Sequence, residues 1–104
     1  MLLVIDIGNT NIVFGLYDED ELGTKHGDPA HKWRMISDVK KSSDDYAIDI
    51  IESLVSAKFD VAQISACIIG SVVPKLSEIL QNALAKFFAG KILVVGSENV
   101  KLQP

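Results

Sequence analysis

The sequence is 104 residues long, 48% hydrophobic and 23% charged, which is the size and composition of one globular domain and excludes a disordered or fibrous chain. A formal net charge of −4 excludes a general electrostatic attraction to nucleic acid or anionic lipid. No apolar run approaches the ~18 residues of a membrane span, and the single cysteine, Cys67, cannot form an internal disulfide, which is compatible with a reducing cytoplasm. We therefore expect one cytoplasmic domain over residues 1–104, with neither nucleic acid nor a membrane as partner.

The first part of the chain predicts three β-strands. Leu2–Ile7 is an apolar run long enough for a buried strand, and Ile12–Tyr17 is a second β-prone segment. Turn-forming residues at Gly8–Asn11 lie between them, which indicates a hairpin. The polar, glycine-containing segment Asp18–Pro29 is expected to be a loop. His31–Ser37 alternates polar and apolar residues and predicts the third strand.

A first helix is predicted after the polar residues Asp38–Ser43. Ser43 is the expected N-cap, and Asp44 and Asp45 follow in the first turn, where carboxylates complement the helix dipole. An apolar face then recurs at helical spacing and ends near Lys58. Its members are Tyr46, Ala47, Ile50, Ile51, Leu54 and Val55.

The remainder predicts a strand, a second helix and a last strand. The apolar run Ile64–Val73 is typical of a central strand covered on both faces, with Cys67 as one of its core residues. Pro74 suits the first turn of a helix, and Gly90 is the expected residue to end it. Lys91–Val95 is the last strand, and a polar tail follows. The apolar face of this helix comprises Leu76, Ile79, Leu80, Ala83, Leu84, Phe87 and Phe88.

The predicted order of elements is therefore β-β-β-α-β-α-β, an α/β fold. Three antiparallel strands extended by two parallel strands, with helices as the crossovers, form a mixed sheet flanked by helices. This order is similar to the ribonuclease H-like domain, a unit that is used twice in the sugar kinase, actin and Hsp70 superfamily.

The most informative stretch for chemistry is Asp6–Asn11. Asp6 stands at the end of an apolar strand, where burial of a carboxylate without a partner is costly, and a hydrated Mg²⁺ beside a phosphate commonly stabilises such a charge. Gly8 permits a tight turn and close approach of a ligand. Asn9 and the residues after it add side-chain donors, and the backbone N–H groups from Gly8 to Val13 can point at phosphate oxygens. A plain hairpin, in which Asp6 and Asn9 only satisfy turn backbone, is the alternative.

Three segments resemble the type III pantothenate kinase family. Asp6–Thr10, directly after the first strand, looks like the family's phosphate-binding hairpin. Trp33-Arg34, followed by a polar stretch and Ser43–Tyr46, is similar to its "WR…T.DEY" segment. Gly70–Pro74 is similar to its "SSVVP" strand end, with Gly70 in place of a usual serine, and Asp45 replaces a usual glutamate in the second segment.

The resemblance implies ATP-dependent phosphorylation of pantothenate to 4′-phosphopantothenate, the first step of coenzyme A synthesis. Asp6 would help to hold Mg²⁺ and ATP, and Ser71 and Val72 would lie near the active cleft. The residues that would cradle the ATP phosphates are Asp6, Ile7, Gly8, Asn9, Thr10, Asn11, Ile12 and Val13. The resemblance further implies a monovalent cation, K⁺ or NH₄⁺, and a homodimer.

The family's "GxDR" segment, which resembles the source of the catalytic base and of the pantothenate contacts, would come after Pro104. A second ribonuclease H-like domain, in the same chain or a separate one, would complete the nucleotide pocket. No catalytic residue is therefore assigned within residues 1–104, and this N-terminal half is expected to be inactive alone.

Two other functions are compatible with the residues. A ribonuclease H-like nuclease gathers several carboxylates around two metal ions, but the strand ending at Ser71 brings no acid to Asp6, and Glu52 falls on the polar face of its helix. A non-catalytic binding or dimerisation module is the other, because an apolar face left by an absent domain needs cover.

Several prominent side chains are assigned structural roles. Tyr46 is predicted to pack in the core. Trp33 and Arg34 fit ordinary strand alternation, with the aromatic ring inward and the cation outward. His26 and His31 lack metal-ligand spacing and are assigned no function.

Overall fold

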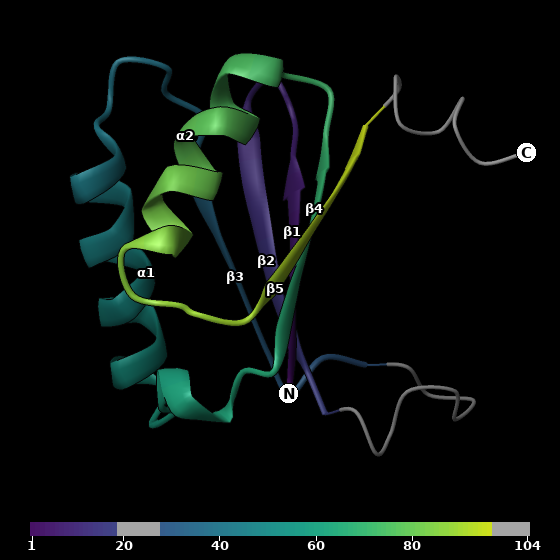
Figure 1. The fold of residues 1–104 in the computed structure, drawn as a ribbon, viewed down its shortest axis with the longest axis vertical. Coiled ribbons are helices and arrows are strands. Elements are labelled where there is room, and N and C mark those ends of the chain that lie inside the picture. Colours follow the sequence, from purple (N-terminus) through teal and green to yellow (C-terminus); the bar gives the residue numbers. More distant parts are fainter. Residues whose placement is uncertain (19–27, 97–104) are drawn as a thin grey trace, which may run out of the picture.

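A computed structural model describes residues 1–18 and 28–96. It contains a five-stranded sheet of order β3-β2-β1-β4-β5, in which β1–β2 and β2–β3 are antiparallel and β1–β4 and β4–β5 are parallel. This mixed sheet with two crossover helices is the predicted ribonuclease H-like arrangement (Figure 1). The elements are β1 (Leu2–Ile7), β2 (Asn11–Tyr17), β3 (His31–Ile36), α1 (Ser43–Ser56), the 3₁₀ turn η2 (Val61–Gln63), β4 (Ala66–Ser71), α2 (Pro74–Ala85) and β5 (Lys91–Gly96).

The two helices lie side by side on one face of the sheet and cover its core-facing residues (Figure 1). Alternate residues of each strand point into this layer, as the two-residue period of a strand requires. The strands contribute Leu3, Ile5, Ile7, Ile12, Phe14, Leu16, Cys67 and Ile69, and the helices contribute Tyr46, Ala47, Ile50, Leu54, Leu76, Leu80, Ala83 and Leu84. Each large side chain buried there contributes about 1.5–3 kcal/mol of transfer free energy.

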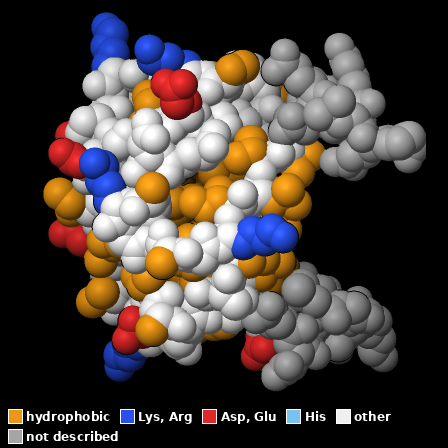
Figure 2. Space-filling view, in the orientation of Figure 1, with side chains coloured by type: hydrophobic (Ala, Val, Ile, Leu, Met, Phe, Trp, Pro, Cys, Tyr) orange, Lys and Arg blue, Asp and Glu red, His pale blue; other side chains and the backbone are white. Residues whose placement is uncertain are grey.

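The opposite face of the sheet is not covered by any described element, which corrects one prediction. The run Ile64–Val73 was expected to be covered on both faces, but β4 buries only Cys67 and Ile69, and Ile68 is half-buried. On β5, Leu93 is 52% exposed. Figure 2, which views the sheet from its β5 edge, shows hydrophobic side chains at the surface along that edge. The continuous apolar run in this strand therefore does not indicate that both faces of the sheet are buried.

Two helix boundaries also differ from the prediction. Ser42, not Ser43, caps α1, because its backbone is extended and its Oγ accepts a hydrogen bond from Asp45 N–H at 3.1 Å. Helix α2 ends at Ala85, well before Gly90. A Cβ at Gly90 would lie 2.3 Å from Phe88 Cζ and 2.9 Å from a backbone oxygen. Gly90 is thus needed for close packing beside the buried Phe88 ring rather than for ending the helix.

Some predictions lie outside the described residues. They concern most of the expected loop Asp18–Pro29, including His26, and the polar tail after β5. Within the described part of the chain, neither helix is long and apolar enough to cross a bilayer.

Candidate functional site

The predicted phosphate-binding residues gather where β1 and β4 end. In the sheet register, Asp6 lies between Val13 of β2 and Gly70 of β4, and Ile7 is paired with Ser71. Parallel strands present their carboxyl ends at the same edge of a sheet, which is the usual place for a ligand in an α/β fold. The hairpin loop and the start of α2 therefore meet at one edge.

The Asp6 side chain is exposed to solvent. The argument from costly burial of this carboxylate was therefore wrong, because Asp6 lies on the uncovered face of the sheet. No hydrogen bond or ion pair ties its carboxylate to the described residues. The charge is accessible, and it is free to bind a hydrated cation.

The loop between β1 and β2 is closed by one backbone hydrogen bond, from Gly8 N–H to Asn11 C=O at 2.9 Å. A Cβ at Gly8 would lie 3.2 Å from that same oxygen, so the tight closure favours glycine. Because its N–H is used within the loop, Gly8 contributes no free backbone donor to a ligand. The backbone N–H groups of Asn9 and Thr10 donate no hydrogen bond within the described part of the chain, and both residues are exposed.

The apolar members of the predicted set have a different role. Ile7 and Ile12 are 1% and 0% exposed, and their side chains pack in the core under the helices. Val13 is half-buried beside Asp6 on the other face. These side chains support the loop, and all three residues are paired with neighbouring strands of the sheet.

The corner between β4 and α2 lies beside the hairpin. Val72 N–H donates to Ile7 C=O at 3.2 Å, and the Val72 side chain is 64% exposed. Ser71 Oγ accepts from Val73 N–H and donates to Val73 C=O, both at 3.0 Å. This local pairing stabilises the turn into α2 and occupies the hydroxyl of Ser71.

Tyr46 is fully buried, as predicted for a core residue, but its hydroxyl also makes specific contacts. Tyr46 Oη accepts from Asp38 N–H at 3.0 Å and lies 3.1 Å from Asp38 C=O and 3.3 Å from Ile36 C=O. The Trp33 ring stacks on Phe14 at 4.9 Å with 2° between the ring planes. The prediction of an inward aromatic ring beside an outward, exposed Arg34 is confirmed.

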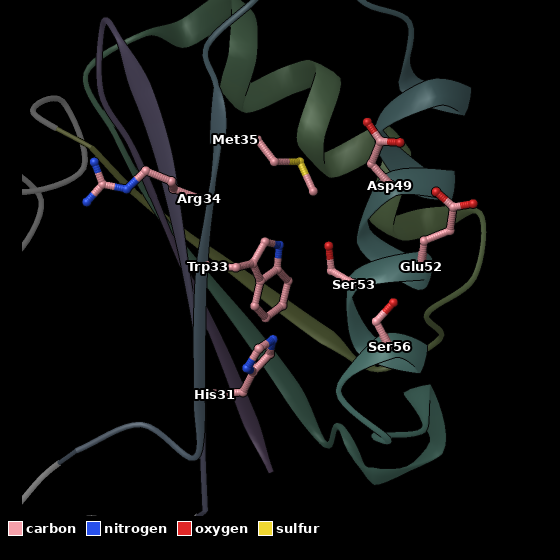
Figure 3. A pocket seen from close by; sticks show the side chains of 8 residues that line it. All are labelled: His31, Trp33, Arg34, Met35, Asp49, Glu52, Ser53 and Ser56. Carbon is pink, nitrogen blue, oxygen red and sulfur yellow. The ribbon is translucent and has the colours of Figure 1, made fainter.

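Sequence patterns did not reveal an open pocket between β3 and α1. Its volume is about 430 Å³, and Figure 3 shows His31, Trp33 and Met35 of β3 facing the side chains of α1, whereas Arg34 points to the other side of β3. The lining residues are His31, Trp33, Arg34, Met35, Asp49, Glu52, Ser53 and Ser56. Trp33 and Met35 are on the helix-covered face, whereas Asp6 is on the opposite face. The pocket is therefore separate from the hairpin site.

The hairpin site suits magnesium better than a metal that requires several protein ligands. The described residues contain no group of three or more His, Cys, Asp or Glu side chains able to hold a metal ion. Mg²⁺ is commonly bound through one or two carboxylates while keeping water and substrate phosphate as its other ligands. The exposed Asp6 carboxylate, beside free loop amides, fits that pattern.

Comparison with known proteins supports the family resemblance. The family model for type III pantothenate kinase matches residues 2–104. The match includes all three segments on which the resemblance rests and every predicted site residue. On the evidence of the fold, the hairpin and this match, the chain belongs to the type III pantothenate kinase family.

Proposed function

We propose that this chain supplies the part of a pantothenate kinase that binds Mg²⁺ and the phosphates of ATP. The observation that supports this most directly is the position of Asp6. Its exposed, unpaired carboxylate lies at the carboxyl end of β1, next to the unbonded backbone donors of Asn9 and Thr10. Negative phosphate oxygens need such donors, and a phosphate-bound cation needs such a carboxylate.

The proposed roles follow from what each group can do. Asp6 would bind Mg²⁺, directly or through water, and the ion would neutralise charge on the transferred phosphoryl group. Asn9, Thr10 and Asn11 would donate hydrogen bonds to phosphate oxygens. Val72, exposed beside Ile7, would form part of the cleft wall.

Further parts of the reaction are proposed from family membership. The acceptor is pantothenate, and a carboxylate outside residues 1–104 removes the proton from its hydroxyl as that oxygen attacks the γ-phosphorus in line. A second domain completes the nucleotide pocket, the assembled enzyme is a cytoplasmic homodimer, and K⁺ or NH₄⁺ accompanies Mg²⁺.

A role as a binding or dimerisation module is a second candidate. The observation that favours it is the uncovered apolar face of the sheet, on which Leu93 of the edge strand β5 is 52% exposed. Light scattering separates the two proposals, since a monodisperse dimer that does not respond to nucleotide would favour the module.

Nothing in the described residues favours a nuclease, because the residues paired with Asp6 on the neighbouring strands are a valine and a glycine, and neither brings a carboxylate.

Titration of the 104-residue chain with Mg·ATP, followed by amide NMR, tests the kinase proposal. About three or four hydrogen bonds of ~1 kcal/mol net must offset an association cost of at least ~4 kcal/mol, so we expect binding no tighter than about millimolar. The Asn9 and Thr10 resonances should shift, and no pantothenate should be phosphorylated by this chain alone.

The matched variants are Asp6→Asn and Glu78→Gln. Both remove one exposed carboxylate charge, but Glu78 lies on α2, outside the proposed site. Asp6→Asn should abolish the Mg²⁺-dependent part of the shifts, and Glu78→Gln should leave it unchanged. Shifts confined to the pocket between β3 and α1, or equal behaviour of the two variants, would contradict the proposal.

A further inference from the structure

Ser37, just after β3, makes two contacts with the hairpin loop of the proposed site. Its Oγ donates to Gly8 C=O at 2.7 Å, and its backbone N–H donates to Thr10 C=O at 2.9 Å. The first bond spans 29 positions of sequence and is partly buried. Ser37 therefore holds the carbonyl groups of Gly8 and Thr10, two of the four residues of the turn, so that both carbonyls face it.

These two contacts determine where the neighbouring N–H groups point. In a trans peptide, the carbonyl of one residue and the N–H of the next point in opposite directions, and the described residues contain no cis peptide bond. With the Gly8 and Thr10 carbonyls directed at Ser37, the N–H groups of Asn9 and Asn11 are directed away from it. Ser37 thereby orients two backbone N–H groups away from itself.

Ser37 is itself held in place by α1. The Tyr46 hydroxyl contacts the backbone on both sides of Ser37: it accepts from Asp38 N–H, and its one proton lies within reach of both Ile36 C=O and Asp38 C=O. Tyr46 is fully buried in the core between the sheet and the helices. A chain of short contacts thus runs from the first turn of α1 through residues 36–38 to the hairpin loop.

We propose that Ser37 is a positioning residue for phosphate binding, acting through the backbone of Gly8 and Thr10. This inference rests on the proposed function of the hairpin. Its hydroxyl is bonded to the Gly8 carbonyl, and its effect is to fix the orientation of the Asn9 and Asn11 amides before phosphate arrives. Preorganised donors are stronger ligands than donors that must be ordered on binding.

The test compares Mg·ATP dissociation constants of three variants of the 104-residue chain by amide NMR titration. Ser37→Ala removes the bond to Gly8, and Ser37→Thr keeps a hydroxyl. Ser65→Ala is the matched control, because Ser65 makes the same two types of bond, through its Oγ at 3.1 Å and its N–H at 2.8 Å, to Met1 C=O before the other end of β1.

We expect about fivefold weaker binding for Ser37→Ala, the equivalent of one hydrogen bond of ~1 kcal/mol. Ser37→Thr should bind within about twofold of the unsubstituted chain on the same scale. In the free protein, Ser37→Ala should also shift the Asn9 and Asn11 amide resonances. Ser65→Ala should change neither the affinity nor these resonances, although it removes a similar contact.

The outcomes separate this inference from the proposed function. If the unsubstituted chain shows no Mg·ATP-dependent shift at the hairpin, the phosphate site fails and this inference fails with it. If that chain binds and Ser37→Ala binds equally well, only the inference is overturned. Weakening by Ser65→Ala to the same extent would also overturn it, because the effect would then reflect general stability.

Discussion

Asp6 of β1 and Gly70 of β4 are paired directly in the parallel part of the sheet. Register partners on neighbouring strands project from the same face, so the Asp6 carboxylate stands beside a position that has no side chain. A Cβ at Gly70 would meet only Val95 C=O, at 3.8 Å, which is ordinary contact. The space at this position therefore accepts a Cβ atom.

Gly70→Ser should therefore fold and be more stable than the unsubstituted chain by about 0.5 kcal/mol, since glycine in a strand loses more chain entropy on folding. Urea unfolding measures this change. Gly90→Ser provides the contrast, because its Cβ would lie 2.3 Å from Phe88 Cζ, and it should destabilise the fold by about 1–3 kcal/mol. Equal effects of the two substitutions would contradict the packing described at both positions.

Removal of the Tyr46 hydroxyl should be costly. Tyr46→Phe keeps the ring in the core but leaves the Asp38 N–H without its partner at 3.0 Å, so we expect a loss of about 1–3 kcal/mol in unfolding free energy. Tyr17→Phe is the control, because Tyr17 is half-buried and its hydroxyl makes no hydrogen bond with the described residues. A cost below that of the control would show that the hydroxyl contacts are unimportant.

The two serines at the start of α1 should respond differently to substitution. Ser42→Ala removes the side-chain acceptor of Asp45 N–H and should cost about 1 kcal/mol. Ser43→Ala lies in the first turn and should be close to neutral, because alanine has the higher helix propensity. Thermal unfolding of both variants decides which serine caps the helix, and the reverse order would restore the original assignment.

Cys67 should be unreactive in the folded protein. Burial raises the pKa of its thiol from 9.0 to about 12, so the reactive thiolate is scarce near neutral pH. Since the folded pKa is raised, its contribution to stability is fully present below pH 9.0 and is lost as pH rises towards about 12. The rate of reaction with a thiol reagent, with and without urea, measures the reactivity. Comparison of the unfolding free energies of Cys67→Ala and the unsubstituted chain as pH rises from 9.0 towards about 12 measures the contribution to stability. Rapid labelling of the folded chain would contradict the burial.

The strand and helix order was predictable because it depends on local patterns. The alternation of His31–Ser37 and the helical spacing of apolar residues from Tyr46 to Leu54 are properties of neighbouring residues, and both elements form as predicted. The hairpin was recognised from its turn residues and from family resemblance. Its role in phosphate binding stays a prediction that the titration with Asp6→Asn tests.

Other features were decided by contacts between distant segments. The choice of Ser42 as cap, the end of α2 before Gly90 and the exposure of Asp6 depend on how the chain packs, and sequence periodicity does not contain that information. Ser37 gave no sequence signal, because its partner Gly8 lies 29 positions away.

The sequence by itself determined the secondary elements, their order and the family, because each is encoded in periodicity or in short motifs. Only the tertiary structure decided which sheet face stays uncovered, where the donors of the hairpin point and which residue holds them. Those properties arise when strands pair and helices pack, so they depend on side chains and carbonyls that are neighbours in space and far apart along the chain.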